Sequence, residues 1–191
     1  MKLALVLLLI VVAVMIGKNR FFSFRAQDPD DYADSGPPFI LTEHLSGEIF
    51  AEGLIYGPNG KMTNSFVATM VGDWDGENGT LAEAFTYSNG AQQNRKWYLK
   101  LGKGNRFTAT ADDVVGEAQG TVSGSTIKMT YKIVLPEESG GHTLDVTDWL
   151  YRTENGIIMN KSEMRKFGIK VAELVATMRP RNLEEFQEAA E

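Results

Sequence analysis

The 191-residue chain contains no cysteine and only two histidines, His44 and His142. The absence of thiols excludes disulfides, thiolate metal sites, a cysteine nucleophile and a lipid-modified N-terminal cysteine. Two histidines are too few for a histidine-rich metal cage. We therefore expect a protein that binds no metal and carries no cofactor.

An excess of basic residues is also missing. Lysine and arginine number 19 against 25 aspartate and glutamate residues, so the net charge is −6, which argues against nucleic acid as a partner. The length suits one domain, with or without a tether, and a hydrophobic content of 43% is enough for a packed core. Glycine is the one surplus, at 19 residues.

Motifs that would indicate a reaction are absent. No glycine-rich phosphate loop opens a helix, and there is no Gly-x-Ser-x-Gly element. The segment 72–76 (GDWDG) is too short for a calcium loop and lacks its final glutamate, so it is better interpreted as a tight hairpin with Trp74 at a barrel mouth. The sequence leaves enzymatic activity open but favours a binding protein.

The N-terminal 25 residues differ in charge from the rest. They contain four basic residues and no acid, which leaves 15 − 25 = −10 for residues 26–191. Residues 3–17 are uninterruptedly apolar and would form a helix about 22 Å long, at about 1.5 Å per residue. That is long for a core helix and short of the roughly 20 residues of a typical membrane span.

This apolar segment has the form of a secretory signal, but no small residues stand at the spacing that signal peptidase reads. Basic and aromatic residues follow it, as is typical of a membrane interface. We therefore predict that residues 1–25 are an uncleaved anchor, in preference to a cleaved signal or a buried core segment, and that the following domain lies in the periplasm. The anchor side chains would include Leu3, Leu7, Ile10, Val14 and Ile16.

Residues 26–38 (AQDPDDYADSGPP) combine three prolines and a glycine with four aspartates. This composition predicts an extended, solvated and acidic linker.

From residue 39 to residue 180 the sequence alternates apolar and polar residues with a period of two, and turn signals recur about every ten residues. The pattern predicts an all-β domain of about nine or ten strands joined by short turns, closed most economically as an antiparallel up-and-down barrel, with a two-sheet sandwich as the alternative. Residues 181–191 would form a short helical tail. The expected strands are 47–57, 64–73, 80–88, 95–102, 106–112, 117–122, 126–135, 143–152, 157–166 and 169–178.

The most informative segment is 81–101. If its hairpin turns near Ala91, Phe85 faces Trp97, and Glu83 lies one diagonal step from Trp97 on the same face as Arg95. A carboxylate and a guanidinium inside a barrel need pairing or a wet cavity. The pair would then either anchor the polar end of a ligand or form a structural ion pair.

A second candidate set comprises Asp148, Asn160 and Lys166. Asp148 and Lys166 would come close only if the strand register ran through a bulge. The alternative is a surface pair near the barrel rim. Met129 and Tyr131 share one face of the strand 126–135 and would line the interior.

Along residues 47–178 a series of short motifs occurs in the following order: 72–76 (GDWDG), Leu81-x-Glu83-x-Phe85-x-Tyr87-x-x-Gly90, Arg95-x-Trp97, Ala111-Asp112-Asp113-Val114-Val115-Gly116-x-Ala118-x-Gly120, Asp148-Trp149-Leu150-Tyr151, and Asn160 with Lys166-Phe167-Gly168. This order resembles that of a bacterial family, the domain of unknown function 3833. The resemblance implies a lipocalin-like barrel outside the cytoplasm, attached to a membrane, without an established enzyme activity. Members tend to accompany fatty-acid-modifying proteins, which implies a lipid ligand. The family's lipobox cysteine is absent, so an anchor at residues 3–17 would replace lipid attachment.

Three hypotheses follow. The first is a membrane-tethered barrel that binds or shields a fatty acyl ligand, with Glu83 and Arg95 orienting its polar end. The second is a lipid-modifying enzyme that uses Glu83, Asp148 or Lys166 as acid or base. The third is an interaction module whose barrel is filled by its own side chains. In the first hypothesis the cavity is lined by Phe85, Trp97, Met129 and Tyr131.

Overall fold

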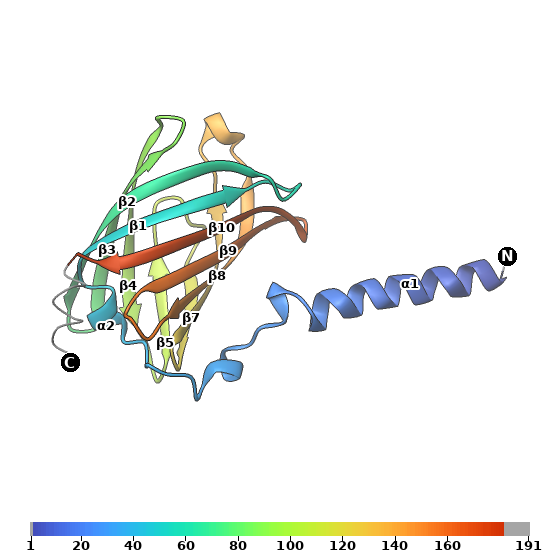
Figure 1. Cartoon of the computed structure of the whole chain (residues 1–191), viewed down its shortest axis with the longest axis horizontal. Coiled ribbons are helices and arrows are strands. Elements are labelled where there is room, and N and C mark those ends of the chain that lie inside the picture. The colour runs from blue at the N-terminus through green and yellow to red at the C-terminus, as the bar shows by residue number, and fades with distance from the viewer. Residues whose placement is uncertain (1, 182–191) are drawn as a thin grey trace.

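Ten antiparallel strands, in chain order, close into one up-and-down barrel (Figure 1). Each strand pairs with its neighbour in sequence, and β1 completes the ring by pairing with β10. A computed structural model describes residues 2–181, without the side chains at positions 2, 3, 12, 13, 15, 16, 18–20 and 138. The strands are β1 (Gly47–Tyr56), β2 (Met62–Asp75), β3 (Asn78–Tyr87), β4 (Gln92–Leu101), β5 (Arg106–Thr110), β6 (Ala118–Ser123), β7 (Thr126–Val134), β8 (Thr143–Arg152), β9 (Ile158–Lys166) and β10 (Ile169–Pro180).

The predicted all-β fold class is confirmed, and every expected segment contains a strand. Alternation is the cause: along β7, Ile127, Met129 and Tyr131 share the inner face, whereas Thr130 is exposed on the outer one. The helical tail predicted for residues 181–191 lies outside the described residues except for Arg181.

One end of the barrel is closed by the segment that precedes β1. A short helix, α2 (Leu41–His44), brings Phe39, Leu41 and Leu45 into the core, where each is at most 6% exposed. Trp74 lies at this end, as expected, and its indole Nε1 donates to the Leu45 carbonyl oxygen at 3.0 Å. Burial of these apolar side chains holds the segment at the end of the barrel.

Burial of the inward side chains changes along the barrel axis. Near α2 they are buried, as Ile49, Ile127 and Leu150 are. In the half of the barrel away from α2, several inward side chains remain partly exposed, although Phe66, Leu144 and Val146 in the same half are buried. These partly exposed residues are Ile55, Phe85, Tyr87, Met129, Tyr131, Asp148 and Leu174.

The segment expected to be a solvated linker is instead a strap packed on the outside of the barrel. We call residues 23–46 the strap; its outer part contains two short 3-10 turns, η1 (Phe24–Ala26) and η2 (Pro29–Tyr32), and its last part is the segment with α2 that closes the barrel end. The Tyr32 ring packs edge-on against Trp149 at 5.3 Å between centroids, and Trp149 is fully buried on the outer face of β8. The expectation of an extended linker was wrong. The aromatic residues that hold the segment lie on a strand far away in sequence, so its own composition does not show these contacts.

Hydrogen bonds also attach the strap to the barrel. The Gln27 side-chain oxygen accepts from the hydroxyls of Tyr32 and Tyr151, both at 2.6 Å, and the backbone N–H of Phe39 donates to the Gly124 carbonyl oxygen at 2.8 Å. Gly124 makes the close approach possible, because a Cβ there would lie 2.0 Å from the carbonyl oxygen of Tyr32.

The N-terminal segment forms a helix, α1 (Lys2–Phe21), that projects away from the barrel (Figure 1). Of the predicted anchor side chains, Leu7, Ile10 and Val14 are 53–64% exposed, whereas those of Leu3 and Ile16 lie outside the described residues. In the described part of the chain, none of the helices has the length and apolarity needed to cross a membrane.

Candidate functional site

Glu83 on β3 and Arg95 on β4 lie directly opposite each other, with both side chains at inward positions. The expected register was wrong. The hairpin is centred on Asn89, and the Tyr87 N–H donates to the Ala91 carbonyl oxygen at 2.9 Å, so the turn is two residues earlier than predicted. The shift places the carboxyl group directly opposite the guanidinium, and the residue that faces Trp97 is Leu81 rather than Phe85.

Arg95 is held by one carboxylate and two aromatic rings. Its Nε donates to Oδ1 of Asp113 at 3.0 Å, and its guanidinium carbon lies 4.1 Å from the ring centroid of Trp97 and 5.8 Å from that of Tyr131. This stacking orients the planar fork. Its Nη2 is buried and has no hydrogen-bond partner among the described residues.

Glu83 is a buried carboxyl group that, like Arg95, has a polar atom without a hydrogen-bond partner. It is 9% exposed, and its Oε2 has no hydrogen-bond partner among the described residues. Burial raises the pKa of Glu83 to about 7, partly offset by the charge of Arg95 and reinforced by those of Asp148 and Asp113. Near neutral pH the group is therefore a mixture of carboxylate and carboxylic acid.

Asp148 on β8 forms the third acidic part of the site. Its Oδ1 accepts from Ser162 Oγ at 2.6 Å and from the side-chain nitrogen of Asn160. Burial raises the pKa of Asp148, and these two hydrogen bonds together with the charge of Arg95 oppose that rise. Asn160 and Ser162 thus share a face with Asp148 across the β8–β9 pair.

Aromatic and apolar side chains surround this polar cluster. Tyr131 packs edge-on against Trp97 with their centroids 5.2 Å apart, and burial raises the pKa of its phenol, which therefore stays neutral. Met129 lies opposite Asp148 on the neighbouring strand. Phe85 packs edge-on against Phe66 with centroids 5.3 Å apart. The cluster is thus polar at its centre and apolar at its walls.

Of the residues predicted for the site, Lys166 does not join it. Lys166 lies at the end of β9 beside the Phe167 ring, 5.8 Å from the centroid, and Asp148 pairs with Ser162 instead. Asp113 was not among the predicted site residues, although its carboxylate accepts a hydrogen bond from Arg95. The signal that would have found it is an acidic residue on the far side of the hairpin that follows an inward arginine.

A hollow of about 500 Å³ reaches the polar cluster along the outer face of β2–β4. It exists where β4 separates from β5, because their pairing covers only Tyr98–Leu101 and leaves Arg95 beyond its end. Its lining comprises Thr69, Val71, Ala82, Glu83, Ala84, Gln93, Asn94, Arg95, Lys96, Asp112 and Asp113.

The chemistry of the cluster favours a hydrogen-bonded ligand over a metal. One guanidinium faces three carboxyl groups, and two of these have raised pKa values. Within residues 2–181, no three histidine or acidic side chains are placed so that they could hold a metal ion together. The site presents one free donor and one free carboxyl oxygen beside aromatic walls.

The sequence model of the "Protein of unknown function (DUF3833)" family matches residues 19–180. The chain belongs to this family. The match includes the strap and all ten strands. A comparison with curated protein sequences gave no match.

Two solved structures share the fold of this DUF3833 protein. The S-type phycobiliprotein lyase CPES from Guillardia theta has a TM-score of 0.55 and 8% identity, covering 74% of this chain and 91% of the lyase. Rv2717c from M. tuberculosis has a TM-score of 0.52 and 16% identity, covering 78% of this chain and 99% of its own. At these identities the likeness establishes a lipocalin-like barrel and nothing of the ligand.

Proposed function

We propose that this DUF3833 protein binds an acyl-chain lipid in the half of the barrel away from α2, with the polar end of the lipid at Arg95 and Glu83. The observation that carries the proposal is the buried pair of unpartnered atoms, Arg95 Nη2 and Glu83 Oε2, among inward side chains that remain partly exposed. Unpartnered buried polar atoms cost about 1–3 kcal/mol each, a cost that a ligand can relieve.

The apolar walls suit the chain of such a ligand. Pockets for small molecules are mostly apolar, with a few polar groups that fix orientation. Met129 and Tyr131 supply apolar surface on one side of the cluster, and Phe85 supplies it on the β3 side. Because three carboxyl groups already surround Arg95, an uncharged polar end such as an ester, a hydroxyl or a protonated carboxyl group fits better than an anion.

Two substitutions on the same strand test the proposal. Met129→Trp fills the inner face of β7, whereas Thr130→Trp places the same ring on the exposed outer face. We expect Met129→Trp to lower the affinity for a fluorescent fatty acid at least tenfold and Thr130→Trp to leave it unchanged. Native mass spectrometry of the gently extracted wild-type chain should show a bound lipid; equal binding by both variants, with no co-purified lipid, would contradict the proposal.

We further propose that α1 holds the barrel against a membrane in the cell envelope. The large apolar side chains of α1 that the structure describes are exposed, and Phe21, its last residue, and the following Phe22 are 72% and 82% exposed. Exposed apolar area of this extent is stabilised by lipid. Flotation with liposomes tests the tether: the wild-type chain should float, and the double variant Leu7→Glu with Ile10→Glu should not.

A further inference from the structure

The turn between β9 and β10 exposes two apolar side chains at its tip. Phe167 is 91% exposed and Ile169 is 69% exposed. Isolated apolar residues on a surface are ordinary. Here, however, two of them lie at the same protruding turn, so they form a small apolar tip.

The backbone at this tip is unfavourable for phenylalanine. Phe167 has φ 53° and Gly168 has φ 79°, so both central residues of the two-residue turn are left-handed. Such turns prefer Asn-Gly, and a bulky residue in this region costs of the order of 1 kcal/mol. Phe167 is the only non-glycine residue with a positive φ among those described. Neither packing nor turn geometry accounts for a phenylalanine here, which points to a contact outside the barrel.

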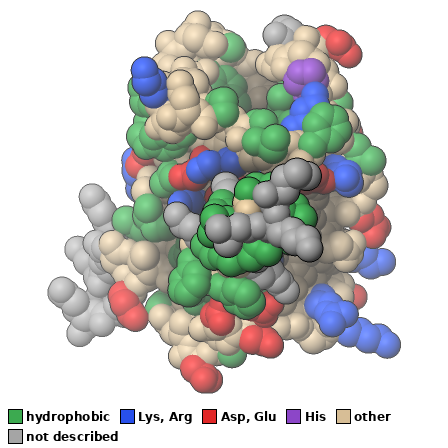
Figure 2. Space-filling view, turned by 90° about the vertical axis from the view of Figure 1, so that its right-hand side faces the viewer, with side chains coloured by type: hydrophobic (Ala, Val, Ile, Leu, Met, Phe, Trp, Pro, Cys, Tyr) green, Lys and Arg blue, Asp and Glu red, His purple; other side chains and the backbone are tan. Residues whose placement is uncertain are grey.

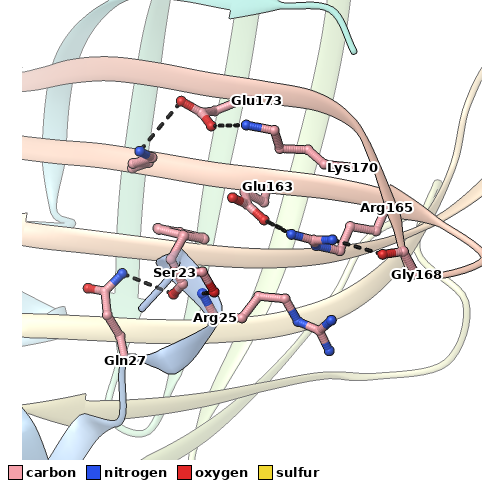
Figure 3. A network of polar contacts seen from close by, with 10 residues as sticks. Ser23, Arg25, Gln27, Glu163, Arg165, Gly168, Lys170 and Glu173 are labelled. Atoms are coloured by element: carbon pink, nitrogen blue, oxygen red, sulfur yellow. Dashed lines mark hydrogen bonds and ion pairs between the residues drawn. The ribbon is translucent and has the colours of Figure 1, made fainter. Parts of the chain in front are cut away.

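Basic side chains surround the tip. Arg165 Nη1 donates to the Gly168 carbonyl oxygen at 2.8 Å, and Lys170 Nζ lies 2.8 Å from Glu173 Oε2 (Figure 3). Lys166 stacks on Phe167 itself. Across residues 161–173 there are four cations and two acids, 4 − 2 = +2, whereas residues 26–191 together carry −10. The tip is therefore a local basic patch on an acidic domain.

The tip and α1 lie on the same side of the barrel (Figure 1). The strap segment that leaves α1 crosses β9, where Lys161 Nζ lies 5.3 Å from the ring centroid of Phe24. Viewed from this side, α1 is seen end-on, with lysine and arginine side chains on either side of its apolar atoms (Figure 2). A surface that receives α1 would also meet the tip.

We propose that the β9–β10 hairpin is a second membrane contact, in which Phe167 and Ile169 enter the interface of an anionic bilayer beside α1. This inference rests on the tether proposed above for α1. Apolar side chains flanked by cations are the combination that binds anionic lipid surfaces. Two contacts would fix the orientation of the barrel on the membrane, which a single helix would leave free to rotate.

The absence of cysteine makes a direct test possible, since one introduced thiol is the only labelling site. The full chain carrying Phe167→Cys is labelled with an environment-sensitive fluorophore and mixed with vesicles of phosphatidylcholine and phosphatidylglycerol. The matched control is Tyr98→Cys, a 51% exposed aromatic on β4, which lies five strands from β9 in either direction around the barrel.

We expect a blue shift and protection from an aqueous quencher at position 167 and no change at position 98. If the chain floats with the vesicles but position 167 stays as accessible as position 98, the hairpin contact is overturned while the tether stands. If the chain does not float, the tether fails and the hairpin inference fails with it. Flotation and label accessibility therefore separate the two failures.

Discussion

Glu83 and Arg95 face each other across β3 and β4 inside the barrel, yet each keeps one buried polar atom without a partner among the described residues. Arg95 uses its Nε on Asp113 and its face on Trp97, so its Nη2 remains free to donate. A strand pair that brings opposite charges together without a hydrogen bond between them leaves both polar atoms available to a third group.

Replacing Glu83 by glutamine should remove a pH dependence of stability. The folded-state pKa is raised from 4.5 to about 7, so the folded protein binds the extra proton between these values. Stability therefore falls as pH rises from about 4.5 to about 7, by about 3 kcal/mol. Urea unfolding at pH 5 and pH 8 should show a larger loss for wild type than for Glu83→Gln. The exposed Glu154→Gln is the control, and a loss of equal size in both Glu83 forms would contradict the assignment.

Replacing Arg95 by methionine should weaken binding of a fluorescent fatty acid about ten- to a hundredfold, because a hydrogen bond to a charged donor contributes about 1.5–3 kcal/mol. Lys100→Met removes a cation from an exposed position on the same strand, outside the lining of the hollow, and should leave affinity unchanged. Circular dichroism verifies that both variants fold. Arg95→Lys keeps the positive charge but lacks the planar guanidinium. Unaltered affinity in Arg95→Met would remove this residue from the site.

Replacing Gly124 by alanine should loosen the strap. The new Cβ would lie 2.0 Å from the Tyr32 carbonyl oxygen, at φ 51°. Gly116→Ala is the matched control, because its φ of 69° is similar and nothing lies within 4 Å of the added atom. We expect Gly124→Ala to lose about 1–3 kcal/mol more than the control and to be cut faster by protease within residues 23–46. Equal losses would show that the strap contributes nothing.

Replacing Phe167 by asparagine should raise the free energy of unfolding by about 1 kcal/mol, since asparagine tolerates the left-handed backbone that phenylalanine resists. A thermal melt of the chain without lipid measures it. A lower midpoint would mean that Phe167 packs on the barrel and is not available to a membrane.

The sequence predicted the strands because alternation and turn residues are local signals, as in β7, where Ile127, Met129 and Tyr131 share a face. The register of the strands was harder to predict from the sequence, because displacing one turn by two residues moved the partner of Glu83 by four positions. The strap was missed because its composition is that of a linker, and only Trp149, more than a hundred residues away, shows where Tyr32 packs.

Pairing of β1 with β10 also sets the timing of folding. Every other strand finds its partner next to it in sequence, but Gly47–Tyr56 must wait for Ile169–Pro180. Until that last segment is synthesised the sheet has two open edges, and such edges invite pairing with other chains. The ring therefore closes only after nearly the whole chain exists, and a chain truncated before β10 would be expected to aggregate rather than to form a smaller barrel.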